Sequence, residues 1–174
     1  MKLKYFIILL SSLVFISFFN YRPVELNPAE RMYSSILCYA DSFEVPLYVA
    51  FNIATLETNY KGPLDSLYNH RQISKAGAMG PMQIMYKYAH SFAGRKVSKK
   101  ELLDSIEFNV QLSMKILSNN YKKYKDWRKA TGAYNTGRPI INSYAIKASD
   151  STYFQKKWIT PFQESKARTH LALD

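Results

Sequence analysis

Glu57 is the side chain in this sequence that is best placed to do chemistry, because it continues an apolar helix face. Ala50, Ile53, Ala54 and Glu57 follow the i, i+3, i+4, i+7 spacing of residues that share one side of a helix. Small apolar neighbours and the negative end of the helix dipole both raise the pKa of a carboxyl group. A glutamic acid that is protonated near neutral pH can donate a proton to a departing sugar oxygen. The competing interpretation is an ordinary glutamate at a helix boundary.

A second chemical signal is the segment 74–85, which combines glycines with two polar side chains. Gly77 and Gly80 allow another chain or a ligand to approach the backbone closely. Pro81 is expected to begin a helix that carries Gln83 in its first turn. A glycine-containing turn between helices would explain the glycines, but it gives no reason for Ser74 and Gln83. The segment is therefore interpreted as a loop that lines a substrate.

Helix signals account for most of the chain after residue 26, and no strand pattern competes with them. Asn27 before Pro28, Pro46, and Ser98 with Glu101 are typical helix starts. Residues 58–80 are expected to be irregular. The expected helices cover 27–40, 46–57, 81–93, a segment from 98, 105–124, 126–135, a segment from 139, and a short one around 153–158.

The longest expected helix, 105–124, carries a buried stripe of Val110, Met114, Leu117 and Tyr121 at helical spacing. Other amphipathic helices can pack around such a stripe. The sequence therefore predicts a mainly α fold, with one helical domain around a long central helix.

The first 22 residues read as an export segment. Lys2 and Lys4 precede an uncharged, apolar stretch, residues 5–21, which Arg22 ends. About 17 helical residues come close to the length that spans a bilayer, and the small residues of a cleavage site are missing. Both an uncleaved signal anchor and a cleaved signal peptide remain open for 1–22. Either would place the domain, 27–165, and a basic tail, 166–174, on the periplasmic side of the inner membrane, in the cell envelope.

The formal charge of +11 implies an acidic partner, or else basic groups that are only solvated. Nucleic acid, anionic lipid and an anionic wall polymer would each fit. An export segment and the lack of a base-reading motif exclude a nucleic-acid binder.

Cysteine and histidine indicate no further chemistry. Cys38 is the one cysteine, so it forms no intrachain disulfide, and it is expected to be a small core residue. His70, His90 and His170 lack the spacing of metal ligands. Neither a metal nor a cofactor is expected.

Four motifs, in order, resemble those of the soluble lytic transglycosylases, whose SLT domain belongs to the lysozyme-like superfamily of α+β folds. The resemblance covers about residues 40–144. It departs from the family at Pro81, where leucine is common, and in the length of the segment between the first two motifs. The motifs are Glu57-Thr58-Asn59-Tyr60, Ser74 to Met85, Asn109-Val110 and Ala133 to Gly137.

This resemblance implies a peptidoglycan enzyme. Glu57 would act first as acid and then as base, in a non-hydrolytic cleavage of the MurNAc-β-1,4-GlcNAc bond that leaves 1,6-anhydro-MurNAc ends. Glycan strands would be the main partner, and an envelope-spanning machinery is a further partner that the sequence leaves open. The residues that would line the glycan cleft or support the reacting sugar are Ser74, Met82, Gln83, Asn109 and Tyr134.

Two other functions remain open. A muramidase-type hydrolase that inverts configuration needs a second carboxylate to activate water, and Asp65 is the candidate, ahead of Asp104 and Glu107. A noncatalytic wall-binding protein would use its basic face alone. The loop 61–73 would border the site in each case.

Overall fold

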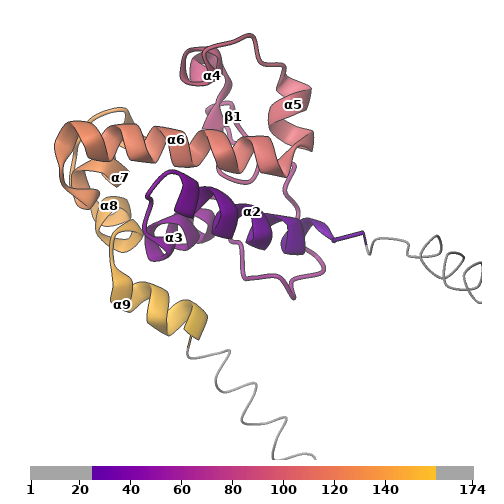
Figure 1. Ribbon diagram of the computed structural model, residues 1–174, viewed down its shortest axis with the longest axis horizontal. Coiled ribbons are helices and arrows are strands. Elements are labelled where there is room, and N and C mark those ends of the chain that lie inside the picture. The colour runs from indigo at the N-terminus through magenta and orange to yellow at the C-terminus, as the bar shows by residue number, and fades with distance from the viewer. Residues whose placement is uncertain (1–24, 160–174) are drawn as a thin grey trace, which may run out of the picture.

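The computed structural model describes residues 25–159 of the 174-residue chain (Figure 1). The predicted export segment 1–22, residues 160–165 of the predicted domain and the predicted tail 166–174 lie outside this range. Between residues 25 and 159, no helix has both the length and the apolar character that crossing a bilayer requires.

The described chain is mainly helical, as the sequence predicts. A two-stranded antiparallel hairpin is the only sheet among residues 25–159; it consists of β1 (Ala78–Met79) and β2 (Ile84–Met85). The helices are α2 (Pro28–Ser42), α3 (Leu47–Thr58), α4 (Tyr86–Ala93), α5 (Lys99–Asp104), α6 (Ile106–Tyr124), α7 (Trp127–Thr136), α8 (Ser143–Ala148) and α9 (Ser151–Phe154), followed by a π-helical turn, η1 (Gln155–Ile159).

The long helix α6 runs across the middle of the molecule (Figure 1), and it contributes side chains to two buried clusters. Val110, Met114 and Leu117 have no exposed surface and belong to the core that α2 and α3 form with α6. Leu112 and Ile116 belong to a second core, under α4, α5 and the hairpin. The predicted central helix is confirmed, and so is the buried stripe at these three positions; Tyr121, its fourth member, is only half-buried and stacks on Trp127.

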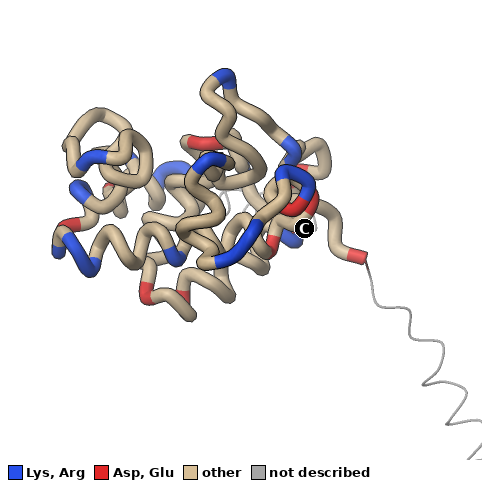
Figure 2. The backbone as a smooth tube through the Cα atoms, turned by 90° about the horizontal axis from the view of Figure 1, so that it is seen from above, with Lys and Arg blue, Asp and Glu red and all other residues tan. Residues whose placement is uncertain are grey.

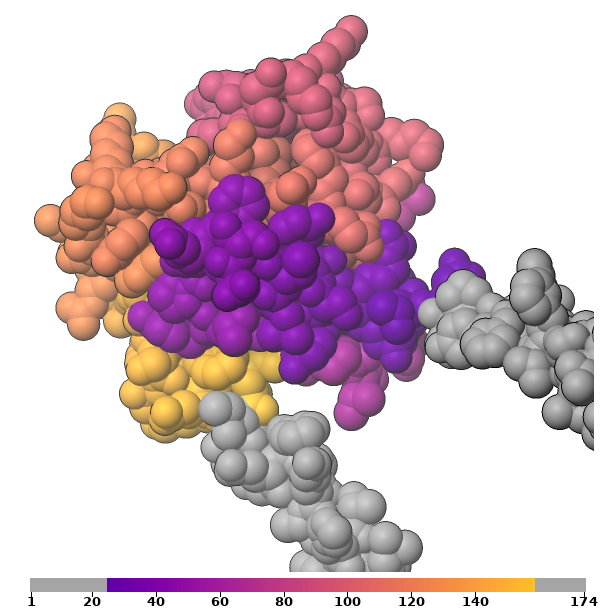
Figure 3. Space-filling view, viewed as in Figure 1, coloured from indigo at the N-terminus to yellow at the C-terminus, as the bar shows by residue number. Residues whose placement is uncertain are grey.

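The outer surface is shared by segments from both ends of the chain. Figure 3 shows α2 and α3 covering the middle of one face, with the α4 and α5 region above them and the α9 segment below. Figure 2 shows Lys and Arg on most elements of the tube. The basic residues between 122 and 129 are exposed around the turn from α6 to α7.

The helix starts follow the capping residues of the sequence. The Asn27 side chain accepts from the Ala29 and Glu30 amides, and Glu30 accepts from the Asn27 amide in return. Ser98 accepts from the Glu101 amide, and Asp126 begins α7 as expected. The Glu101 carboxylate pairs with Arg95. These starts are local, which is why they could be predicted.

The expected helix start at Pro81 is wrong. Pro81 lies in the turn between β1 and β2, and α4 begins only at Tyr86. Gly80 and Gln83 both have positive φ values, 79° and 51°, which a right-handed helix does not allow. The expectation that the chain forms no strands is also wrong, because this turn brings residues 78–79 and 84–85 together as β1 and β2.

Two further expectations are corrected. Pro139 begins no helix; α8 starts after Asn142, whose side chain accepts from the Ala145 amide. The segment before α8 packs closely against α7 at Gly132. A Cβ on Gly132 would lie 2.1 Å from the Ile140 carbonyl oxygen. Cys38 is exposed, because the buried face of α2 passes through Ile36 and Ala40 and turns Cys38 outward.

The turn 80–83 is held by one buried amide, Asn109 of α6. Its Nδ2 donates to the Met79 and Leu102 carbonyls, at 2.9 and 3.0 Å, and its Oδ1 accepts from the Met82 amide at 3.0 Å. A Cβ on Gly80 would lie 2.3 Å from Asn109 Nδ2, so the close approach needs glycine. Asn109 thus connects the central helix to both the hairpin and α5.

We expect Asn109→Asp to destabilise the fold by roughly 3 kcal/mol or more, because a buried carboxylate cannot donate to the two carbonyls and lacks a cation. Urea unfolding would measure the loss. Asn119→Asp, at an exposed position of the same helix, is the matched control and should change the free energy of unfolding by less than about 0.5 kcal/mol. Equal effects of the two substitutions would contradict the role of Asn109.

Candidate active site

Glu57 lies in the last turn of α3, at the point where a buried helix meets a hollow. Ala50, Ile53 and Ala54 on the same face of α3 have no exposed surface. The helix ends at Thr58, and Asn59 adopts the left-handed conformation that turns the chain away. Glu57 lines a hollow of about 520 Å³, together with loop residues from 59 to 72. Glu57 is therefore partly buried and borders a hollow.

The pKa of Glu57 is raised from 4.5 to about 7. Burial is the main cause, since it disfavours the charged form. The hydroxyl of Tyr144, in α8, donates to Glu57 Oε1 at 2.5 Å and partly offsets this rise. The expected upward shift of the pKa is thus present in the structure, and burial is its cause.

Tyr144 is a site residue that the sequence did not indicate. Burial and the neighbouring Glu57 carboxylate raise the pKa of Tyr144 well above its usual value, so its hydroxyl stays protonated and remains a donor. Because Oε1 accepts this hydrogen bond, the proton of a neutral Glu57 is carried by Oε2. The two residues are 87 positions apart, and no periodicity relates them.

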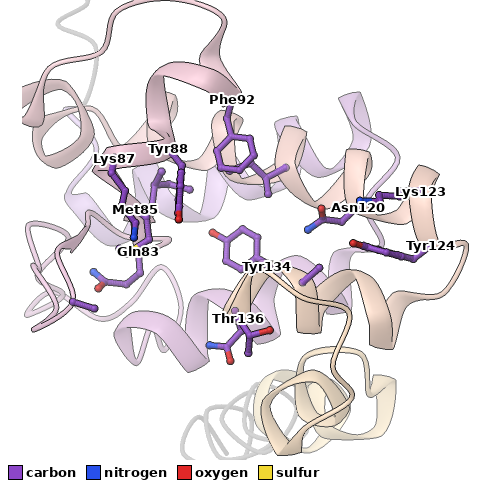
Figure 4. Close-up of a pocket in the computed structure, with 16 residues that line it drawn as sticks. Gln83, Met85, Lys87, Tyr88, Phe92, Asn120, Lys123, Tyr124, Tyr134 and Thr136 are labelled. Carbon is purple, nitrogen blue, oxygen red and sulfur yellow. The ribbon is translucent and has the colours of Figure 1, made fainter.

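Tyr134 connects α7 to the turn of the hairpin and to α6. Its hydroxyl donates to the Met82 carbonyl at 2.6 Å and lies 2.8 Å from Ser113 Oγ. Burial and the nearby Glu57 carboxylate raise its pKa. Tyr134 also lines a second hollow, of about 490 Å³, together with Gln83 (Figure 4). Tyr134 is thus near Glu57 and also lines the second hollow.

The other predicted site residues lie around these two hollows in different roles. Gln83 lines the second hollow, and its Nε2 donates to the Gly80 and Gln72 carbonyls. Ser74 accepts from the Ala78 amide and lines neither hollow. Met82 and Asn109 are completely buried and line neither hollow. They hold the turn 80–83 in place from inside the domain, where their hydrogen bonds and packing contacts lie.

The loop 61–73 borders the Glu57 hollow, as expected. Asp65 lines this hollow and is the other carboxylate among its described lining residues. Tyr68 is buried beneath the loop, with its hydroxyl 2.9 Å from Thr58 Oγ1. The remaining two candidate acids are held elsewhere. Glu107 pairs with Arg31 at 2.7 Å, and Asp104 pairs with Lys100 and Arg71.

Comparisons with known proteins identify the same fold. A family model described as transglycosylase SLT domain matches residues 39–158. The crystal structure of the 70 kDa soluble lytic transglycosylase from Escherichia coli is similar, with a TM-score of 0.51 and 25% identity over 77% of this chain. The complex of the 70 kDa soluble lytic transglycosylase with bulgecin A has the same TM-score and identity, over 71% of this chain.

The described similarity concerns only part of those enzymes. The matched region covers 21% of the first structure and 20% of the second. No curated protein matches the chain.

We expect Glu57→Gln to become more stable, relative to the unsubstituted chain, as pH rises. The folded chain binds the Glu57 proton more tightly than the unfolded chain does. The contribution of this proton to the free energy of unfolding is therefore fully present below pH 4.5 and is lost as the pH rises through about 7. Glutamine does not titrate, so the difference in unfolding free energy should grow by roughly 3 kcal/mol from pH 4.5 to pH 8. Urea unfolding of both proteins across this range checks it, and a constant difference would contradict the raised pKa.

We expect Tyr144→Phe to raise the pKa of Glu57 above its value of about 7, because it removes the hydrogen bond that favours the carboxylate. Titration of the glutamate carboxyl carbons by NMR measures this shift. Tyr39→Phe, on α2, is the matched control and should leave the titration of Glu57 unchanged. A lower pKa in Tyr144→Phe would show that the hydroxyl does not stabilise the carboxylate.

Proposed function

Because this chain belongs to the transglycosylase SLT family, we propose that it is a peptidoglycan lytic transglycosylase with Glu57 as its acid and base. The observation that carries the proposal is Glu57 itself, a mostly buried carboxyl group whose pKa is raised to about 7 and which borders a hollow. Near neutral pH such a group is present in both forms, so it can donate a proton in one step and accept one in the next.

In the first step, Glu57 donates its proton to the oxygen between N-acetylmuramic acid and N-acetylglucosamine. Tyr144 occupies Oε1, so Oε2 is the donating oxygen. Proton donation makes the departing sugar a neutral alcohol and leaves positive charge on the muramyl ring. The N-acetyl group of that ring is suited to stabilise this charge. The carboxylate that remains keeps the Tyr144 hydrogen bond.

In the second step, the Glu57 carboxylate takes the proton of the C6 hydroxyl of the same muramyl ring. The C6 oxygen attacks C1 and closes a 1,6-anhydro ring, and Glu57 is protonated again. The attacking group belongs to the substrate itself, so its effective concentration is high. One carboxyl group therefore suffices, whereas an inverting hydrolase needs two.

The similar solved structures support this proposal at the level of the reaction class, since both are described as lytic transglycosylases. One of them was solved in complex with bulgecin A. This chain spans about a fifth of the length of those proteins, so the proposal concerns the domain that contains Glu57.

A hydrolase of the same fold is the second candidate, and Asp65 favours it. Asp65 lines the same hollow as Glu57, and an inverting hydrolase needs a second carboxylate to activate water. A noncatalytic wall-binding protein is less well supported, because it has no need of a buried acid that is hydrogen-bonded and open to one side.

The proposed location is the cell envelope. Residues 1–22 have the composition of an export segment, and they would either anchor the domain to the inner membrane or be removed. The charge of +11 suits a wall that carries carboxylates and phosphates. A role beside an envelope-spanning machinery would use the same location.

We expect the full chain to release 1,6-anhydro-muropeptides from purified sacculi, and Glu57→Gln to reduce their release at least about a thousandfold. Glutamine keeps the shape but cannot exchange the proton. Mass spectrometry of the products measures both. The rate should fall above pH 7, since the first step needs protonated Glu57.

Asp65→Asn is the control that separates the two enzyme classes. A transglycosylase should keep its anhydro products in this variant. Products with reducing ends that disappear in both Asp65→Asn and Glu57→Gln would instead establish a hydrolase, and no products from any protein would favour the wall binder.

A further inference from the structure

The helix that carries Tyr144, α8, has only six residues, Ser143–Ala148. A helix this short does not persist through its own hydrogen bonds, so contacts with the rest of the fold must hold it in place. It packs against α3 and α7, and its residues Ala145 and Ala148 have no exposed surface. The position of the Tyr144 hydroxyl, and with it the hydrogen bond to Glu57, therefore depends on how α8 is attached to its neighbours.

Asn52 of α3 attaches the end of α8. This side chain is completely buried. Its Nδ2 donates to the carbonyl oxygens of Lys147, Ala148 and Asp150, at 3.1, 3.4 and 3.0 Å. The last carbonyl groups of a helix have no partner within the helix, so a donor from outside can satisfy them. The amide group of Asn52 thus connects α3 to the C-terminal end of α8.

This attachment uses the same helix that carries the acid. Asn52 and Glu57 are five positions apart on α3, which corresponds to roughly 7.5 Å along the helix axis. Thr131 of α7 also donates to α8, at the Ala145 carbonyl and over 3.2 Å, but this contact fixes α8 to a different helix. The contact of Asn52 instead fixes the distance between α8 and the helix of Glu57.

Stability alone does not explain an asparagine at this position. The Oδ1 atom of Asn52 is buried and has no hydrogen-bond partner among the described residues. A buried acceptor without a partner costs free energy, which an apolar side chain would avoid. Such departures from the rules of stable packing are expected at functional sites, where a particular geometry is needed.

We infer that Asn52 is a positioning residue for the reaction, because it holds α8 at the distance from α3 at which the Tyr144 hydroxyl reaches Glu57 Oε1. Asn52 is completely buried and lines neither hollow, so it acts through Tyr144 and does not contact the glycan. Its effect on catalysis rests on the proposed function. The consequence is that Oε1 stays occupied and Oε2 remains the oxygen that donates the proton.

The first test is an NMR titration of the Glu57 carboxyl group in the full chain and in Asn52→Ala. Loss of the attachment lets α8 move away from α3 and weakens the hydrogen bond that favours the carboxylate. The pKa of Glu57 should therefore rise from about 7 by a further ~0.5, and by at least as much in Tyr144→Phe. An unchanged pKa in Asn52→Ala would overturn the inference.

A double substitution separates an effect through Tyr144 from a direct one. Adding Asn52→Ala to Tyr144→Phe should change the pKa of Glu57 by less than about 0.2, because the hydrogen bond is already missing. Two shifts that simply add would show that Asn52 acts by another route, and the inference would fail.

Ile36→Val, on α2 in the same core, is the matched control for a general loss of stability, and it should leave the pKa of Glu57 unchanged. A shift as large as that of Asn52→Ala would overturn the inference. Asn52→Ser covers the case in which Asn52→Ala does not fold. A serine hydroxyl in a helix bonds to a carbonyl of the preceding turn and does not reach α8, so this variant should raise the pKa of Glu57 as well.

Release of anhydro products from purified sacculi tests the effect on catalysis. In Asn52→Ala, kcat should fall about tenfold while KM stays within about twofold, because the acid loses its geometry and neither hollow changes. The fall in rate above pH 7 should move to higher pH. If the unsubstituted chain releases no anhydro products, the proposed function fails, but the titration still decides whether Asn52 positions Tyr144. Anhydro products together with an unshifted pKa in Asn52→Ala would overturn this inference and leave the proposed function intact.

Discussion

The burial of the Glu57 carboxyl group is the constraint on which the rest of the site depends. A carboxylate loses favourable hydration when apolar atoms surround it, so at neutral pH its burial opposes folding. The fold compensates by packing α2, α8 and α9 against α3, in a core that also includes side chains of α6. Tyr144 supplies the one hydrogen bond that keeps the charged form accessible. The reactivity of Glu57 thus comes from a core that is stable enough to bear this cost.

A second requirement is that flexible segments be fixed around this acid without covering it. Asn109 does this for the turn 80–83 through hydrogen bonds to the Met79 carbonyl and the Met82 amide, and Tyr134 takes the same role from α7 by donating to the Met82 carbonyl. On the other side, Tyr60 donates to the Ala29 carbonyl at 2.7 Å, and Trp158 packs against Gly62 and Tyr60. Segments from both ends of the described chain therefore hold the borders of the Glu57 hollow, and the hollow itself stays open.

The two hollows differ in the charged residues that line them. One contains the acid and a second carboxylate, where a departing sugar and its proton must be handled. The other is lined by Lys87, Lys123 and both aromatic and aliphatic side chains, and none of its described lining residues is acidic. Lys61 also lines the Glu57 hollow, but burial is the largest influence on Glu57 and raises its pKa.

Local sequence determined the helices and the acid. Caps such as Asn27 and Asp126, the stripe on α6 and the apolar face that ends at Glu57 depend on residues within one or two turns, so they could be predicted. Only the tertiary structure decided the hairpin turn at Pro81, the buried position of Asn109 and the contact of Tyr144 with Glu57. The last two depend on hydrogen bonds between residues 27 and 87 positions apart. No local pattern encodes a partner that the chain meets only after it has folded.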